Sequence, residues 1–308
     1  MFKSVGPLVT RYRSLLLAAA AVLLVGTPLD RAAAALSKHD QACVNKSLKA
    51  ASNVTKAFSR SAAKCVKTIG KGQPVGDAAT CTMANPKIAS SESKLTDTIN
   101  ASCTYPFPID CPPPCDATDA GGATTGVDDD TELADCFNCM GASSTWSGNV
   151  PPGPLQGFNG ALYQTSTIYP SSNQPIAGCQ NKLVKFAQRL FLGKIKFYIH
   201  CVQQALAGGA TSPPSSCIAD GGNPNVNPVI GTAASKIASV TNNPNCTPGP
   251  PFIFDNDQCA NLDGQNLADC VERIAECKYC NLARVLIGDT STNCDLFDDG
   301  LADGSCTP

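Results

Sequence analysis

Cysteine is the residue whose number and spacing in this chain most clearly imply chemistry. The 308 residues include 18 cysteines, and two Cys-x-x-Cys pairs stand out, Cys136 with Cys139 and Cys277 with Cys280. Such a pair exchanges thiols and disulfides when a helix N-terminus lowers the pKa of one thiol. Neither pair follows a strand of a βαβ unit, and both lie among many other cysteines. Structural disulfides are therefore the favoured interpretation of both pairs.

A group of carboxylates near the C-terminus is a weak candidate for calcium, which prefers hard oxygen ligands. Its members are Asp295, Asp298, Asp299 and Asp303. The segment does not match a helix-loop-helix calcium site, because Phe297 occupies a ligand position and Cys306 stands where the bidentate glutamate belongs. The favoured alternative is an Asp/Gly turn that a disulfide between Cys294 and Cys306 closes.

A basic stripe is the third chemical feature. The segment from residue 37 to residue 71 contains eight lysines and arginines but a single acidic residue, Asp40. Seven of them recur at a helical period and form the predicted polyanion-binding stripe: Lys46, Lys49, Lys56, Arg60, Lys64, Lys67 and Lys71. Such a face suits an anionic polymer or lipid surface. The alternative is a solvated face that the chain's own acidic loops partly neutralise.

The elements that position these groups follow from a repeated cysteine spacing. Cys43, Cys65 and Cys81 are separated by 22 and then 16 residues, and the same two intervals recur at Cys179, Cys201 and Cys217. Leu-Ala-Asp-Cys also occurs twice, ending at Cys136 and at Cys270. We interpret the pattern as an internal duplication, and we call the two parts the first and the second copy.

The spacing predicts how the cysteines pair. At about 100° per residue, 22 residues make six turns plus roughly 40°, so two such cysteines share one helix face about 33 Å apart. Cys81 and Cys103 are also 22 residues apart, and two helices with equal spacing suit an antiparallel hairpin. The predicted disulfides are Cys43–Cys103 and Cys65–Cys81 and, by the duplication, Cys179–Cys246 and Cys201–Cys217. The second hairpin departs from the pattern, because Cys217 and Cys246 are 29 residues apart, and a Gly-Gly-Asn-Pro-Asn loop near residue 221 accounts for the excess. The partners of the following cysteines stay open: Cys111, Cys115, Cys136, Cys139, Cys259, Cys270, Cys277 and Cys280.

The predicted fold class is all-α, with two tandem disulfide-stapled antiparallel helical hairpins or small bundles and long Pro/Gly-rich loops. Apolar residues recur at helical intervals through both copies, for example at Val54 and Phe58. We expect a signal peptide at 1–35, a first cysteine-rich helical domain at 36–140, a Gly/Pro/Ser-rich linker at 141–175 and a second cysteine-rich helical domain at 176–308.

The N-terminal segment has the three-part plan of a secretory signal peptide. Lys3, Arg11 and Arg13 precede an apolar run from Leu15 to Val25, and an alanine-rich stretch follows. The run is too short to cross a bilayer as a helix. We expect cleavage near Ala35, no transmembrane segment afterwards, and a secreted, periplasmic or cell-surface location in which disulfides persist.

Several of these motifs resemble a group of uncharacterised, cysteine-rich, internally duplicated exported proteins predicted from environmental bacterial genomes. The resemblance rests on Cys43-x21-Cys65-Val-Lys, on both Leu-Ala-Asp-Cys motifs, on Cys277-Lys-Tyr-Cys-Asn-Leu-Ala-Arg284 and on Phe297-Asp-Asp-Gly-x-Ala-Asp-Gly-Ser-Cys306. It covers both copies. It implies export and a bacterial envelope setting, and it carries no activity.

The sequence favours a non-catalytic exported structural or binding protein of the cell surface. Its two histidines, His39 and His200, form no recognisable catalytic motif with a nucleophile. We expect no enzymatic activity, no cofactor, and a partner that is an anionic envelope polymer or another surface protein. The formal net charge of −2 does not favour nucleic acid. The alternatives are a calcium-stabilised surface module and a thiol-disulfide redox protein that uses a Cys-x-x-Cys pair.

Overall fold

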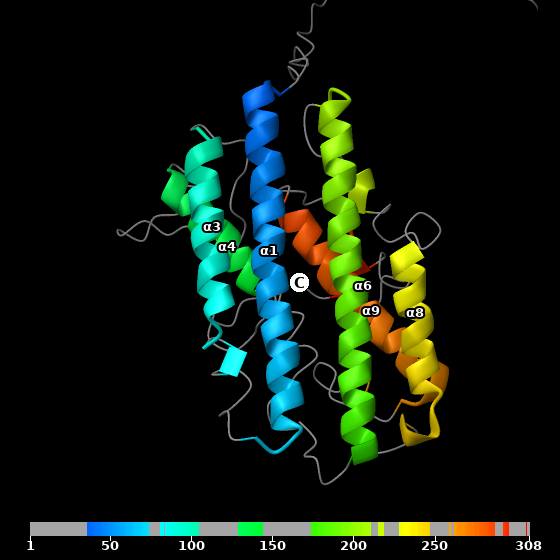
Figure 1. Ribbon diagram of the computed structural model, residues 1–308. Coiled ribbons are helices and arrows are strands. Elements are labelled where there is room, and N and C mark those ends of the chain that lie inside the picture. The colour runs from blue at the N-terminus through cyan, green and yellow to red at the C-terminus, as the bar shows by residue number, and fades with distance from the viewer. Residues whose placement is uncertain are drawn as a thin grey trace, which may run out of the picture. The chain divides into compact units, whose positions relative to one another are not determined.

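The computed structural model is all-α in the part of the chain that it describes, with disulfides between its helices (Figure 1). The described residues are 36–73, 81–82, 84–104, 129–143, 174–210, 215–218, 228–246, 259, 262–286, 292–295 and 306. The helices are α1 (Lys38–Ile69), α3 (Pro86–Ser102), α4 (Asp130–Ser143), α6 (Gln174–Ala207), α8 (Pro228–Thr241), the short 3-10 helix η3 (Pro244–Cys246) and α9 (Gly264–Leu286). The predicted fold class is confirmed.

Local sequence signals explain where α1 begins and ends. At its start Ser37 and Asp40 form a reciprocal cap, in which the Asp40 amide donates to Ser37 Oγ (3.1 Å) and the Ser37 amide donates to Asp40 Oδ2 (3.3 Å). At its end Gly72 takes a positive φ of 73°, and its amide donates to the Ile69 carbonyl. Glycine takes this conformation without a steric penalty, so it ends the helix there.

The second helix of the first copy begins at a proline, as the sequence predicts. Asn85 caps α3 by accepting a hydrogen bond from the Lys87 amide, and Pro86 occupies the first turn, where it sacrifices no helical hydrogen bond. Ile88 and Leu95 point into the core from one side of α3, and the core face of α1 meets them there. The two helices pack as a hairpin, and α4 packs against both of them.

Disulfides join the ends of both hairpins. In the first copy Cys43 is bonded to Cys103 and Cys65 to Cys81. In the second copy the bonds are Cys179–Cys246 and Cys201–Cys217. These are the four pairs that the helical spacing and the duplication together predict. Each hairpin is therefore held covalently near both ends of its long helix.

The two copies pack together within one compact unit that comprises Ala35–Pro308. The long helices α1 and α6 run side by side (Figure 1), and Gln188 Nε2 on α6 donates to Ser59 Oγ on α1 at 2.7 Å. Helix α9 packs against α6 and α8 as α4 does against α1 and α3. The predicted domain limits stay predictions of sequence organisation, and most of the linker at 141–175 lies outside the described residues.

The prediction of a Cys294–Cys306 disulfide is wrong. Cys306 is bonded to Cys277 and Cys294 to Cys280, so the C-terminal segment is stapled to α9 and is not closed on itself. The reason is helical geometry, because Cys277 and Cys280 lie one turn apart on one buried face of α9 and each receives a separate partner. A further disulfide, Cys259–Cys270, joins the start of α9 to the preceding segment.

The seven disulfides between described residues indicate an oxidising compartment. None of the helices searched in the described residues combines the length and apolarity that crossing a membrane requires. The predicted signal peptide at 1–35 lies outside the described residues. Cys111 and Cys115 also lie outside them.

Candidate functional site

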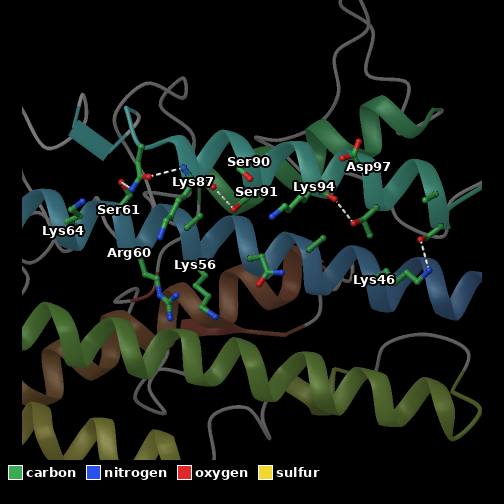
Figure 2. Close-up of a pocket in the computed structure, with 17 residues that line it drawn as sticks. Lys46, Lys56, Arg60, Ser61, Lys64, Lys87, Ser90, Ser91, Lys94 and Asp97 are labelled. Atoms are coloured by element: carbon green, nitrogen blue, oxygen red, sulfur yellow. Dashed lines mark hydrogen bonds between the residues drawn. The ribbon is translucent and has the colours of Figure 1, made fainter.

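The candidate site is a groove between α1 and α3, with a volume of about 1040 Å³. Figure 2 shows its residues on the two helices, whose antiparallel packing brings the start of α1 to the end of α3. The core faces of both helices turn away from the groove and bury Leu48, Phe58 and Leu95. The groove therefore runs along the outer seam of the hairpin, where polar side chains of both helices meet.

Covalent and hydrogen bonds hold the two walls of the groove in register. The Cys43–Cys103 and Cys65–Cys81 disulfides join the hairpin near its two ends. Asn85 Nδ2 donates to Ser61 Oγ at 3.0 Å, and this hydroxyl donates to the Thr82 carbonyl at 3.1 Å. These bonds fix the width of the groove before any ligand binds, which reduces the entropy cost of binding.

Positive charge dominates the groove. Six of its lining residues are cations, and one, Asp97, is an acid. The cations are Lys46, Lys56, Arg60, Lys64, Lys87 and Lys94. Lys46 Nζ donates to Ser102 Oγ at 3.1 Å. The other five cationic side chains make no ion pair or hydrogen bond with any described residue. Their charge is thus uncompensated by the part of the protein that the structure describes.

The structure divides the predicted basic stripe into two sets. Lys46, Lys56, Arg60 and Lys64 line the groove. The remaining members, Lys49, Lys67 and Lys71, are exposed and do not line it. The six members on α1 lie on the side opposite its core face, and Lys71 follows the end of the helix at Ile69.

Sequence reasoning missed two groove residues, Lys87 and Lys94 of α3. They are seven residues apart, so they lie on one face of the helix two turns from each other. That interval was visible in the sequence. What the sequence did not reveal is that this face of α3 lies beside the basic stripe of α1, because the contact depends on how the hairpin is rotated.

The second copy keeps only part of the groove's cationic set at its corresponding positions. When Cys65 is aligned with Cys201, Lys56 corresponds to Leu192, and when Pro86 is aligned with Pro228, Lys87 corresponds to Val229. Helices α6 and α8 also approach closely, since a Cβ atom at Gly193 would lie 3.6 Å from Val229 Cγ1 and 3.8 Å from Ile230 Cγ1. Lys46, Arg60 and Lys94 correspond to Lys182, Lys196 and Lys236, so the second copy keeps half of the six cationic positions and lacks the other half.

A buried ion pair lies in the second copy. Lys194 on α6 is fully buried, and its Nζ donates to Glu276 Oε1 on α9 at 2.7 Å. The same ammonium group lies 5.8 Å from the centroid of the Tyr279 ring. The Tyr279 hydroxyl in turn donates to the Ile218 carbonyl at 3.0 Å. The pair therefore stands in a packed core, and burial raises the pKa of Glu276 although Lys194 acts to lower it.

Glu272 lies one turn before Glu276 and lines a smaller hollow on α9. Burial, followed by the nearby charges of Glu276 and Asp269, raises its pKa from the ordinary 4.5 to about 7, while Lys194 acts in the opposite direction. The folded protein thus binds this proton more tightly than the unfolded chain does. Its contribution to the free energy of unfolding therefore falls as the pH rises from about 4.5 to about 7, and it is constant at higher pH.

We expect Glu272→Gln to stabilise the protein at pH 8 by on the order of 1 kcal/mol and to have little effect near pH 4.5, because partial exposure screens the repulsion. Urea unfolding across this pH range measures the change. Asp135→Asn, which removes an exposed carboxylate of α4, is the matched control and should leave the pH dependence unchanged. Equal effects of the two substitutions at every pH would contradict the prediction.

The structure gives less support to the other predicted sites, which are the two Cys-x-x-Cys pairs and the calcium candidates. Cys277 and Cys280 are bonded to different partners and not to each other, and Cys136 is also in a disulfide. The described residues include no free cysteine. The side chain of Cys139 lies outside the part of the chain that is described.

The predicted calcium ligands are only partly described, because Asp298, Asp299 and Asp303 lie outside the described residues. Asp295 Oδ1 accepts a hydrogen bond from the Cys306 amide at 3.0 Å. Its own amide donates to Asn293 Oδ1 at 3.0 Å. This carboxylate therefore orders the disulfide-bonded tail. Among the residues searched there is no group of three or more metal-ligating side chains.

Comparisons of this chain with protein-family models, curated proteins and solved structures found no match. The functional argument therefore rests on the groove itself.

Proposed function

We propose that this chain is a non-catalytic exported binding protein of the cell surface, and that its α1–α3 groove binds an anionic polymer of the envelope. The observation that carries the proposal is the set of five groove cations without a described partner: Lys56, Arg60, Lys64, Lys87 and Lys94. Clustered cations in a concave site focus the electrostatic potential and attract anions. Lysines that only solubilised a helix would need neither a groove nor a second wall.

The disulfides support this proposal in two ways. They place the chain in an oxidising compartment, which agrees with export. They also hold both walls of the groove, so that binding requires little ordering of the backbone. Use of the described cysteines as structural bonds favours a binding role over a thiol-exchange role, since Cys277 and Cys280 are not available to each other.

The test compares two triple substitutions that change the net charge equally. Lys56→Glu, Arg60→Glu and Lys64→Glu together reverse one wall of the groove. We expect this variant to lose about 100-fold in affinity for fluorescein-labelled heparin, used as a model polyanion, in anisotropy titrations at about 50 mM salt. Wild-type binding should weaken steeply at about 300 mM salt, because screening shortens with ionic strength.

The control variant carries Lys49→Glu, Lys67→Glu and Lys71→Glu, three positions outside the groove, of which the first two lie on α1 and the third just after its end. We expect it to lose less than about 5-fold, since its cations do not line the site. Circular dichroism verifies that both variants keep their helices. An equal loss in the two variants would show that the general charge of α1, and not the groove, attracts the polymer, and the proposal would then be wrong.

A further inference from the structure

The side chains that line the groove indicate which kind of polyanion binds there, because neutral hydrogen-bonding groups lie between its cations. Along α3 the lining order is Lys87, Ser90, Lys94 and Thr98, and these residues follow one another at intervals of three or four. Each step is therefore about one helical turn, which is ~5 Å along the axis. Ser91 and the carboxylate Asp97 also line this wall, so α3 presents two cations with hydroxyls between and beyond them and one acid.

The α1 wall has a related composition. Asn53 lies one turn before Lys56, whereas Ser61, between Arg60 and Lys64, is buried and its hydroxyl is already bonded to Asn85 and to the Thr82 carbonyl. The side chains of Asn53 and Ser90 make no hydrogen bond with any described residue. Ser91 and Thr98 donate to the carbonyls of Lys87 and Lys94, so their oxygens keep capacity only to accept. The groove therefore offers neutral donors and acceptors between its charges.

We infer that the groove takes a linear acidic glycan, in which each charged sugar carries one carboxylate or sulfate together with several hydroxyls. The inference rests on the proposed function and specifies its ligand class. Lysine ammonium groups bind the acidic substituents, and the amide and hydroxyl side chains between them bind the sugar hydroxyls. From Lys46 to Lys64 the α1 wall extends about 27 Å, so the site spans several sugars.

Nucleic acid fits the same groove less well. None of the 17 residues that line it is aromatic, and aromatic side chains are the platforms on which single-stranded bases stack. The backbone of a deoxynucleotide strand also has no free hydroxyls along its length that could pair with the hydroxyl positions of the α3 wall.

An anionic membrane is disfavoured by shape. The groove cations line a concavity between two helices, and a lipid surface would meet the exposed flank of α1 first, where Lys49 and Lys67 lie. The apolar lining residues are only Ala50, Ala57 and Ala101, which are too small to enter the acyl region of a bilayer.

The decisive experiment uses three probes of similar total charge with the full-length disulfide-bonded protein. The probes are oligogalacturonates of graded length, linear polyphosphate and oligodeoxythymidylate. We expect oligogalacturonate to bind tightest, by about 10-fold, and its affinity to rise with length until the chain covers the ~27 Å of the groove. Vesicles of phosphatidylglycerol serve as the membrane probe and should bind weakest.

A second variant tests the neutral groups. Asn53→Ala, Ser90→Ala and Thr98→Val together remove uncharged side-chain groups and leave every groove cation in place. We expect this variant to lose about 10-fold in affinity for oligogalacturonate and less than about 2-fold for polyphosphate, because only the glycan uses those positions. Ser52→Ala, on α1 outside the groove, is the matched control and should change neither affinity.

The outcomes separate this inference from the proposed function. If polyphosphate, oligodeoxythymidylate or the vesicles bind at least as tightly as oligogalacturonate and the Lys56/Arg60/Lys64 variant loses that binding, the groove binds anions but the glycan inference is wrong. Equal losses of glycan and polyphosphate affinity in the neutral variant would also overturn it. If the Lys56/Arg60/Lys64 variant binds every probe as wild type does, the proposed function fails as well.

Discussion

Replacing Lys194 with methionine is expected to lower the free energy of unfolding by about 3–5 kcal/mol at neutral pH. The substitution removes the ammonium group that pairs with Glu276 at 2.7 Å and leaves that carboxylate in the core with only partial access to solvent. A buried charge without its partner costs several kcal/mol because it has lost its hydration. Urea unfolding followed by circular dichroism measures the loss.

A double substitution separates the pair from the packing around it. Lys194→Met with Glu276→Leu removes both charges, and we expect a stability close to wild type, since apolar residues of similar size often replace a buried ion pair at little cost. The cost of Lys194→Met alone should also shrink at low pH, where Glu276 becomes protonated and its charge disappears. Lys196→Met, on the exposed side of the same helix, is the control and should change stability by less than about 0.5 kcal/mol. A Lys194→Met protein as stable as the control would contradict the prediction.

The second large effect is expected from the disulfide that closes the first hairpin. Substituting Cys43→Ala with Cys103→Ala opens a loop whose ends are 60 residues apart, and we expect a loss of about 4 kcal/mol. Both cysteines are buried, so part of the loss comes from packing, for example around Ser47, whose Oγ lies 3.4 Å from Cys103 Sγ. Chemical denaturation under oxidising conditions provides the measurement.

The other disulfide of the same hairpin is the matched comparison. Cys65→Ala with Cys81→Ala opens a loop of 16 residues, for which chain entropy predicts a smaller loss of about 3 kcal/mol. Mass spectrometry of non-reduced peptides verifies that the remaining bonds are native in each variant. A larger loss from the short loop than from the long one would show that loop closure does not govern the stability of this hairpin.

The cysteines show which disulfides of this protein local sequence rules can predict and which they cannot. Four disulfides were predictable because one partner of each sits on a long helix, where the number of residues fixes the angle and the distance between side chains, and because the duplication repeats these intervals. The disulfide partners of the two cysteines in the C-terminal tail were not predictable in this way. Cys294 and Cys306 lie outside long helices, so their partners depended on where the chain comes to rest against α9.

Lys194 shows a signal that the duplication contains. Alignment of Cys65 with Cys201 places Lys194 at the position of Phe58, which is buried. The duplication thus indicated a core position. Its ion-pair partner was not indicated, because Glu276 comes from a helix 82 residues away in the chain.

The sequence by itself determined the helices, their ends and the spacing of their staples, since periodicity, caps and prolines act within a few residues along the chain. It also determined that α1 carries a basic stripe. Only the tertiary structure decided that Lys87 and Lys94 of α3 line one groove with part of that stripe. It also decided that Lys49 and Lys67 lie outside the groove. The physical reason is that a groove belongs to two helices at once, and its lining depends on the rotation at which their core faces pack.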